Sequence, residues 1–173
     1  MDEITELKNR IAALEQEKVI LTKQLELKDR HLQLILQHVP ITITAFNRDG
    51  NLEMGVGAGF KLYSEEIDTP RLINALFSLS YEQFSEVFPG VMQAVDIAFT
   101  EKCVTRAEIS SSQGYLFHTV LVPYFNKDKE VEYVYSLGMR WPIPEEIDTK
   151  YFFKGSVNIE KLRNLGIVPN RQI

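Results

Sequence analysis

The first 39 residues carry apolar side chains at alternating spacings of three and four, and they include no Gly or Pro. This pattern predicts one long amphipathic helix with a narrow apolar stripe. In heptad notation the a positions start at Ile4 and the d positions at Leu7, and nine of these eleven positions are apolar. Such a repeat is typical of a coiled coil. The predicted interface residues are Ile4, Leu7, Ile11, Leu14, Lys18, Leu21, Leu25, Lys28, Leu32 and Ile35.

The order of side chains in this stripe favours a parallel pair of identical helices. Ile at a with Leu at d, as in the first two heptads, favours two parallel strands. In such a pair Glu3 would face Lys8, and Arg10 would face Glu15, so both pairs attract. Lys18 and Lys28 interrupt the stripe and would limit register and oligomer number at a cost in stability. The alternative is a helix packed on its own domain, but at a length of roughly 55–60 Å it would be longer than one domain can cover.

The pattern changes at Pro40, because the residue before proline is driven out of the helical region. Alternation and turn residues then predict five strands, and helical spacing with start signals at Thr69-Pro70, Ser80 and Pro89 predicts short helices between the second and third strands. The predicted fold class is α+β, with a five-stranded antiparallel sheet and short helices on one face. The predicted strands are 41–46, 51–54, 104–110, 115–125 and 131–139, and the predicted helices are 71–78, 81–87 and 90–101, with a further short piece beginning at Phe60.

The turn Asn47-Arg48-Asp49-Gly50, together with the order of the elements around it, resembles a PAS (Per-Arnt-Sim) domain over residues 35–141. The resemblance implies a sensory or dimerising module in which a coiled-coil helix carries signals between domains. PAS domains usually end with an Asp-x-Thr turn that leads into a C-terminal helix. This chain has Met139-Arg140-Trp141-Pro142 there, with a second proline at 144, which would block that helix. An N-terminal signal route through residues 1–39 is therefore favoured.

A concave sheet covered by short helices predicts a small-molecule pocket, with Phe46, Phe99, His118 and Tyr135 as candidate lining residues. The cofactor is left unknown. Haem needs an axial ligand, and haem-binding PAS domains usually take it from the long helix, but residues 89–101 contain no histidine. The Asn-Cys-Arg motif of photoactive flavin modules is absent as well.

Other candidate chemistry is weakly supported by the sequence. The glycines at 55, 57 and 59 lack the further glycine or Lys-Ser/Thr pair of a phosphate loop, so they indicate a flexible strand exit. His38 lacks the neighbours of a phosphoacceptor histidine. No catalytic triad, paired carboxylates or metal-ligand spacing is present, so we expect no catalytic residue and no metal. The single cysteine, Cys103, cannot form an internal disulfide and favours a reducing, cytoplasmic compartment.

Composition narrows the class of protein further. The chain has 173 residues, 45% hydrophobic and 25% charged, which fits one domain with an appendage. Its net charge of −5 includes no basic cluster of the kind that binds nucleic acid. No run of 18 apolar residues predicts a membrane span, and no secretory signal is visible. The predicted organisation is a dimerisation helix (1–39), a PAS-like sensor domain (40–141) and a tail (142–173) with short helices near 145–147 and 158–165.

These observations favour a cytoplasmic, non-catalytic signalling module. It would form a parallel homodimer and would either sense a small ligand or bind a partner signalling protein. One alternative is the sensor end of a larger histidine kinase or cyclase. Another is a GAF-like small-molecule-binding domain, which would bring a six-stranded sheet and a different helix order.

Overall fold

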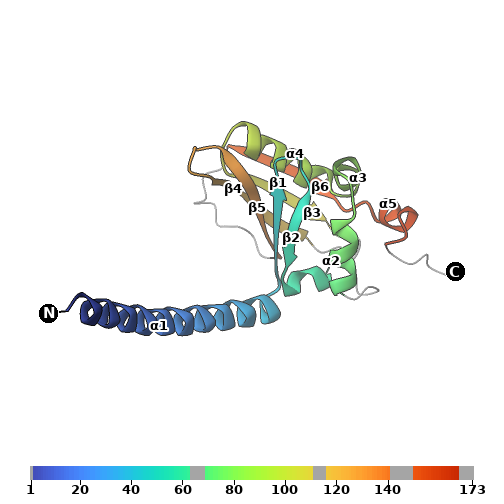
Figure 1. The fold of residues 1–173 in the computed structure, drawn as a ribbon. Helices are drawn as coiled ribbons and strands as arrows, with labels where there is room; N and C mark the ends of the chain where they lie inside the picture. The colour runs from blue at the N-terminus through green and yellow to red at the C-terminus, as the bar shows by residue number, and fades with distance from the viewer. Residues whose placement is uncertain (1, 63–68, 111–115, 141–149, 168–173) are drawn as a thin grey trace. The chain divides into compact units, whose positions relative to one another are not determined.

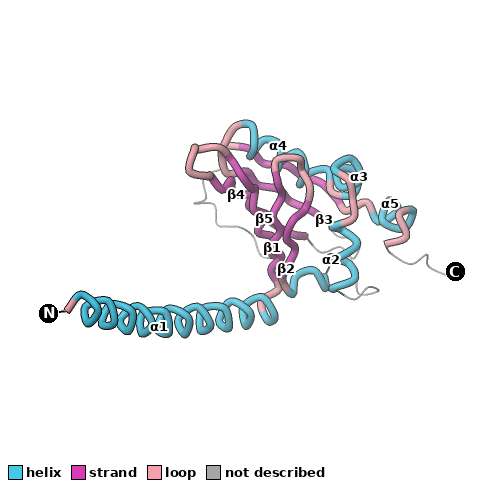
Figure 2. The backbone as a smooth tube through the Cα atoms, viewed as in Figure 1, coloured by secondary structure: helices cyan, strands magenta, loops and turns pink. Residues whose placement is uncertain are grey.

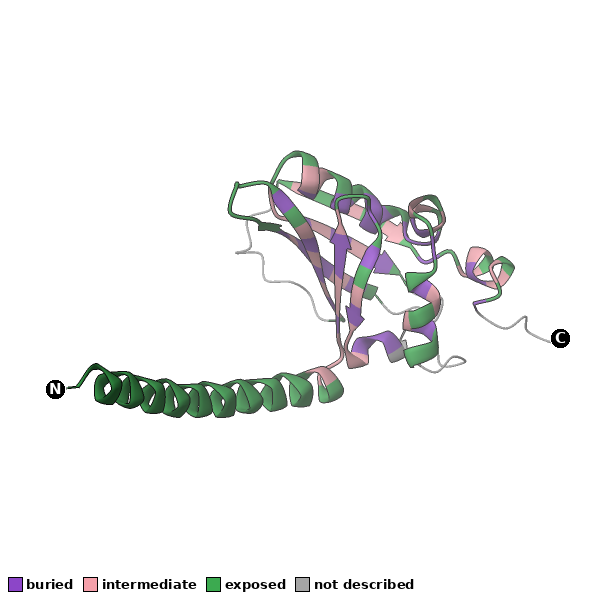
Figure 3. Cartoon of the chain, in the orientation of Figure 1, coloured by how far each residue is buried: buried purple, intermediate pink, exposed green. Residues whose placement is uncertain are grey.

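The computed structural model describes residues 2–62, 69–110, 116–140 and 150–167, and it divides the chain into two compact units, Met1–His38 and Val39–Ile173 (Figure 1). The first unit is a single helix, α1 (Glu3–His38), with no buried residue. Figure 3 shows almost all of it exposed. The predicted long helix is confirmed, and its pairing into a coiled coil stays a prediction. Within the described part of the chain, no helix is both long and apolar enough to cross a membrane.

The second unit is built on a mixed six-stranded sheet in the order β2-β1-β5-β4-β3-β6. All neighbouring strands pair antiparallel except β6, which pairs parallel to β3. The strands are β1 (Ile41–Asn47), β2 (Leu52–Val56), β3 (Thr105–Ser110), β4 (Leu116–Phe125), β5 (Val131–Met139) and β6 (Tyr151–Ser156).

The prediction of five antiparallel strands was wrong at one edge of the sheet. The tail, expected to form only short helices, supplies β6. Six strands are also expected of the GAF-like alternative. Here, however, the sixth strand comes from the tail, and the helices keep their predicted place between β2 and β3. The predicted helix at 158–165 is observed as α5 (Ile159–Asn164), whose first turn is capped by Asn158. The helix start at 145–147, the Trp141-Pro142 segment and Tyr115 lie outside the described residues.

The remaining helices follow β2 in the chain and cover one face of the sheet (Figures 1 and 2). The helix at Tyr81 begins where the sequence predicts, and the others begin one or two residues before the predicted positions. Ser80 forms a capping box with Gln83, and Pro89 occupies the first turn of the longest of these helices, where its missing N–H costs nothing. These elements are η1 (Ala58–Leu62), α2 (Thr69–Phe77), α3 (Tyr81–Val87) and α4 (Pro89–Thr100).

The hydrophobic core lies between that sheet face and the helices. Strand alternation sends Phe117, Leu121 and Val134 to this side, where they join the buried face of α4, including Met92 and Val95. α5 is attached to α3 by an ion pair between Lys161 and Glu86 and by the backbone hydrogen bond from Asn158 N to Val87 O. The tail therefore completes the core instead of standing apart from it.

Two glycines fix the path of the chain where β1 begins. A Cβ at Gly57 would lie 2.2 Å from the carbonyl oxygen of Ile41, and one at Gly59 would lie 2.7 Å from the carbonyl carbon of the same residue. Gly57 also has a φ of 117°, a conformation that other residues rarely adopt. The glycine run that the sequence indicated as a flexible exit is thus a close contact with the first residue of β1.

Candidate ligand cavity

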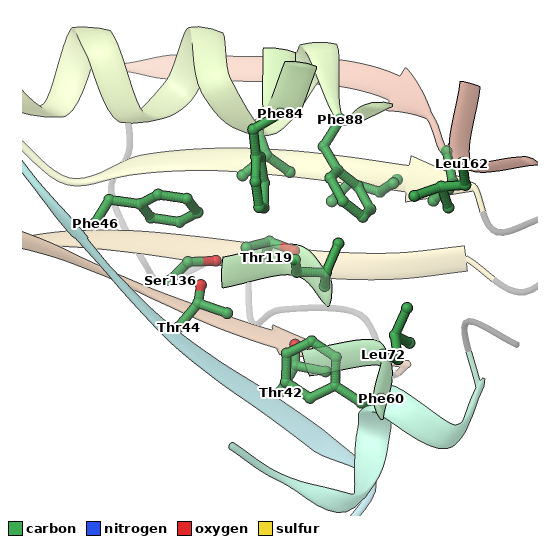
Figure 4. Close-up of a pocket in the computed structure, with 14 residues that line it drawn as sticks. Thr42, Thr44, Phe46, Phe60, Leu72, Phe84, Phe88, Thr119, Ser136 and Leu162 are labelled. Carbon is green, nitrogen blue, oxygen red and sulfur yellow. The ribbon is translucent and has the colours of Figure 1, made fainter. Parts of the chain in front are cut away.

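A cavity of about 50 Å³ lies between the sheet and the helices of the second unit (Figure 4). Its floor comes from β1, β3, β4 and β5, and its other walls come from η1, α2, α3, the start of α4 and the tail. The lining residues are Thr42, Thr44, Phe46, Ile109, Thr119 and Ser136 on the sheet, and Phe60, Leu72, Leu76, Phe84, Phe88, Val91, Val157 and Leu162 opposite.

The polar part of the cavity is a group of four hydroxyls on three adjacent strands. The strand register explains why they gather there. Thr44 of β1 stands opposite Ser136 of β5, and Thr42 and Thr119 stand on either side of Gly138. A Cβ at Gly138 would lie 2.4 Å from Thr42 Oγ1 and 3.4 Å from Thr119 Oγ1. The glycine therefore leaves the space that the two hydroxyls occupy.

The hydrogen bonds of these hydroxyls are incomplete. Thr42 Oγ1 donates to the Gly138 carbonyl at 3.5 Å, the long limit of such a bond. Thr119 is 2% exposed, and within the described residues its Oγ1 has no hydrogen-bond partner. A buried hydroxyl without a partner costs free energy. Thr119 is therefore the polar group in the wall that a bound molecule could satisfy.

The rest of the lining is apolar. Phe46 packs edge-to-face against Phe84, with ring centroids 5.4 Å apart, and every lining residue is uncharged. A charged ligand placed here would lose its hydration without gaining an ion pair from the lining side chains. The arrangement suits binding, and its described lining residues include no ionisable side chain.

The four pocket residues proposed from the sequence do not gather around one space. Phe46 lines the cavity. His118 precedes Thr119 and so points to the opposite face of β4, where its Nδ1 lies 3.7 Å from Glu108 Oε2. The ring of Tyr135 lies edge-to-face against that of Tyr124, with ring centroids 6.1 Å apart. Phe99 lines a separate, open hollow. The missed residues are the four hydroxyls, and two of them, Thr42 and Thr44, have a sequence signal in the Ile-Thr-Ile-Thr alternation at the start of β1.

The open hollow lies beside the Asn47–Gly50 turn, and polar contacts join the residues around it. Tyr81 Oη donates to Asp96 Oδ2 at 2.6 Å, and this hydrogen bond raises the pKa of Tyr81 above its ordinary value. Glu130 pairs with both Lys102 and Arg48 at 3.1 Å. The hydrogen bond and charge of Lys102 hold the pKa of Glu130 below its ordinary value, and Arg48 adds to this effect.

Metal and thiol chemistry find little support in this geometry. Among the described residues, no group of three or more His, Cys, Asp or Glu side chains is placed to hold a metal ion. Cys103 is a half-buried free thiol after the end of α4.

No protein-family model and no curated protein matches the chain. Solved structures similar to it include a sensory box sensor histidine kinase from Vibrio cholerae, at 14% identity over 74% of this chain and 99% of that chain, with a TM-score of 0.44. A PAS domain from Colwellia psychrerythraea matches at 16% identity over 65% and 94%, with a TM-score of 0.41. The PAS domain of Bordetella pertussis BvgS matches at 10% over 80% and 97%, with a TM-score of 0.39. The resemblance to PAS domains is thus found among solved structures too, and at these values it assigns no ligand, partner or activity.

Proposed function

We propose that the chain is a cytoplasmic, non-catalytic signalling module of the PAS type, which forms a parallel homodimer through α1 and receives a small molecule in the cavity of its second unit. The observation that carries this proposal is the exposure of the apolar stripe of α1.

The stripe is too exposed to be stable in water without a partner. Ile4, Leu7, Ile11 and Leu14 are 55–59% exposed, and Leu25 is 69% exposed. Helices gain most of their stability from packing an apolar face, and burial contributes about 25 cal/mol per Å² of apolar area. A second copy of the same helix supplies a matching stripe and the attractive Glu3–Lys8 and Arg10–Glu15 pairs.

The cavity and α1 are linked by a short stretch of chain. Only Val39, Pro40 and Ile41 separate the last residue of α1 from Thr42, which lines the cavity. Gly57 and Gly59 pack against Ile41 in this stretch. A change in the position of β1 on ligand binding would therefore reach the C-terminal end of α1. This supports the N-terminal signal route.

The variant Leu14→Asp/Leu21→Asp tests the dimer. Two buried, unpaired carboxylates per helix cost far more than a coiled coil of this length can offset, so we expect a monomer by light scattering at micromolar concentration. The matched control is Gln16→Asp/Lys23→Asp, which places the same side chains on the opposite face of α1 and should leave the dimer intact. A dimer that persists in Leu14→Asp/Leu21→Asp would show that the second unit makes the contact and would refute the role of α1.

A further inference from the structure

We propose that the cavity selects an uncharged molecule of about four heavy atoms or fewer that carries a carbonyl or amide group, and that Thr119 is the residue that hydrogen-bonds to it. This inference rests on the proposed ligand-sensing function and adds the chemical class of the ligand.

The volume sets the size of the ligand. A cavity of about 150 Å³ admits benzene, which has six heavy atoms, and a single water needs about 10–15 Å³. At about 50 Å³ the cavity has room for a molecule between these limits. A planar cofactor or a long acyl chain is larger than this volume and would have to extend outside it.

The lining sets the charge of the ligand. Its described residues supply four hydroxyls and no ionisable side chain, so they offer a charged group no counter-charge. A hydroxyl both donates and accepts hydrogen bonds. The cluster can thus satisfy a carbonyl oxygen or an amide N–H, while the surrounding Phe and Leu side chains cover the apolar end of the ligand.

The buried hydroxyls set where the polar end of the ligand lies. Among the described residues, Thr119 Oγ1 is the cavity hydroxyl that is buried without a partner, and Thr42 Oγ1 lies across Gly138 from it with one long hydrogen bond. Figure 4 shows Thr119, Ser136, Thr44 and Thr42 on the sheet side, with Phe84, Phe88 and Leu72 on the helix side. A ligand carbonyl directed at the sheet would accept from Thr119, and its apolar end would face the helices.

Three probes of the same planar shape separate the possible ligand classes. Acetamide is neutral, acetate is an anion and acetamidinium is a cation, and each has four heavy atoms. Each is titrated into the full chain while the methyl resonances of Leu76, Val91 and Leu162 are followed by NMR. We expect saturable shifts with acetamide and none with the two ions at equal ionic strength. For a ligand of this size the dissociation constant will be no tighter than roughly 40 µM.

The variant Thr119→Val tests the assigned residue, because it replaces the hydroxyl by a methyl group in the same space. We expect its acetamide affinity to be about fivefold weaker. We also expect its ligand-free midpoint of thermal unfolding to be higher by about 2–4 °C, since an unpaired buried hydroxyl is removed. The control Thr105→Val removes a buried hydroxyl that donates to Ala94 O at 2.9 Å and that lies outside the cavity. It should lower the midpoint and leave acetamide binding unchanged.

The outcomes separate this inference from the proposed function. Tighter binding of acetate or acetamidinium would overturn the ligand class while leaving a ligand-binding module. Equal acetamide affinity in Thr119→Val and the native chain would overturn the role of Thr119. The absence of saturable shifts with all three probes would overturn both the inference and the sensing part of the proposed function, and the dimer experiment would stand unaffected.

Discussion

Each of the two hairpin loops begins with an asparagine whose side chain accepts two backbone hydrogen bonds. Asn47 Oδ1 accepts from the backbone N–H groups of Asp49 and Asn51 at 3.0 Å, and Asn126 Oδ1 accepts from those of Asp128 and Glu130 at 2.9 and 3.0 Å. Such side-chain contacts stabilise turns locally. The two loops are then joined by the Arg48–Glu130 ion pair. Local turn chemistry and one ionic contact thus fix this end of the sheet.

The variant Glu130→Gln gives a pH prediction at this scale. Lys102 and Arg48 lower the pKa of Glu130 in the folded state. The resulting stabilisation is therefore present above the pKa of the unfolded chain and is lost as the pH falls through the folded pKa. We expect a lower midpoint of unfolding than that of the native chain at pH 7, and a difference that shrinks as the pH falls through the folded pKa of Glu130. Added salt should shrink the gap, because the pair is exposed.

The neighbouring exposed residue provides the control for that experiment. Glu132→Gln removes the same charge two residues further along the chain. If Glu132→Gln reproduced the pH dependence of Glu130→Gln, the effect would come from net charge and not from the contacts with Lys102 and Arg48.

Residue-level expectations from the sequence succeeded where the cause is local. The Asn47–Gly50 turn and the Ser80 cap follow from neighbouring residues, and both are present. The cavity hydroxyls depend on strand register, since Thr119 reaches Thr42 only through Gly138 of a third strand. Local sequence patterns do not predict this pairing of strands. For that reason Thr119 was missed and His118, on the other face of the same strand, was proposed.

Among the elements, β5 and β6 show what the sequence could and could not predict. β5 has clear alternation after a charged loop, and its bounds, Val131–Met139, were predicted. β6 reads Tyr-Phe-Phe-Lys-Gly-Ser, without a clear period, and it contains a glycine that weakens a strand taken alone. Its pairing with β3 and the close approach of Gly155 to Gly90 at the start of α4 join segments far apart in the chain.

The direction of the α1 pair is the prediction at the scale of elements. In a parallel pair the two Leu7 side chains face each other, while an antiparallel pair would place them about 40 Å apart. We expect Leu7→Cys in a Cys103→Ser background to form a disulfide-linked dimer under mild oxidation, because facing d positions approach closely enough for one.

The control for that cross-link is Asn9→Cys in the same background, which lies away from the stripe and should link poorly. Equal yields from the two positions would indicate random collision, and no link at position 7 in an intact dimer would contradict the parallel direction.

At the scale of the whole molecule, the two units have different requirements for stability. The second unit buries its own core, which includes residues from the tail, and it contains the cavity. The first unit has no buried residue and exposes an apolar stripe along its length. We therefore expect the assembled molecule to be a dimer. In it the apolar stripe of α1 packs against the same stripe of a second chain, and each second unit has its own cavity.

The mass of the full chain in solution tests this claim most directly. Sedimentation equilibrium at micromolar concentration should give twice the chain mass of 19.9 kDa, with no dependence on the presence of a small ligand. A single species at 19.9 kDa under the same conditions would contradict the account, because the apolar stripe of α1 would then have no second copy to cover it.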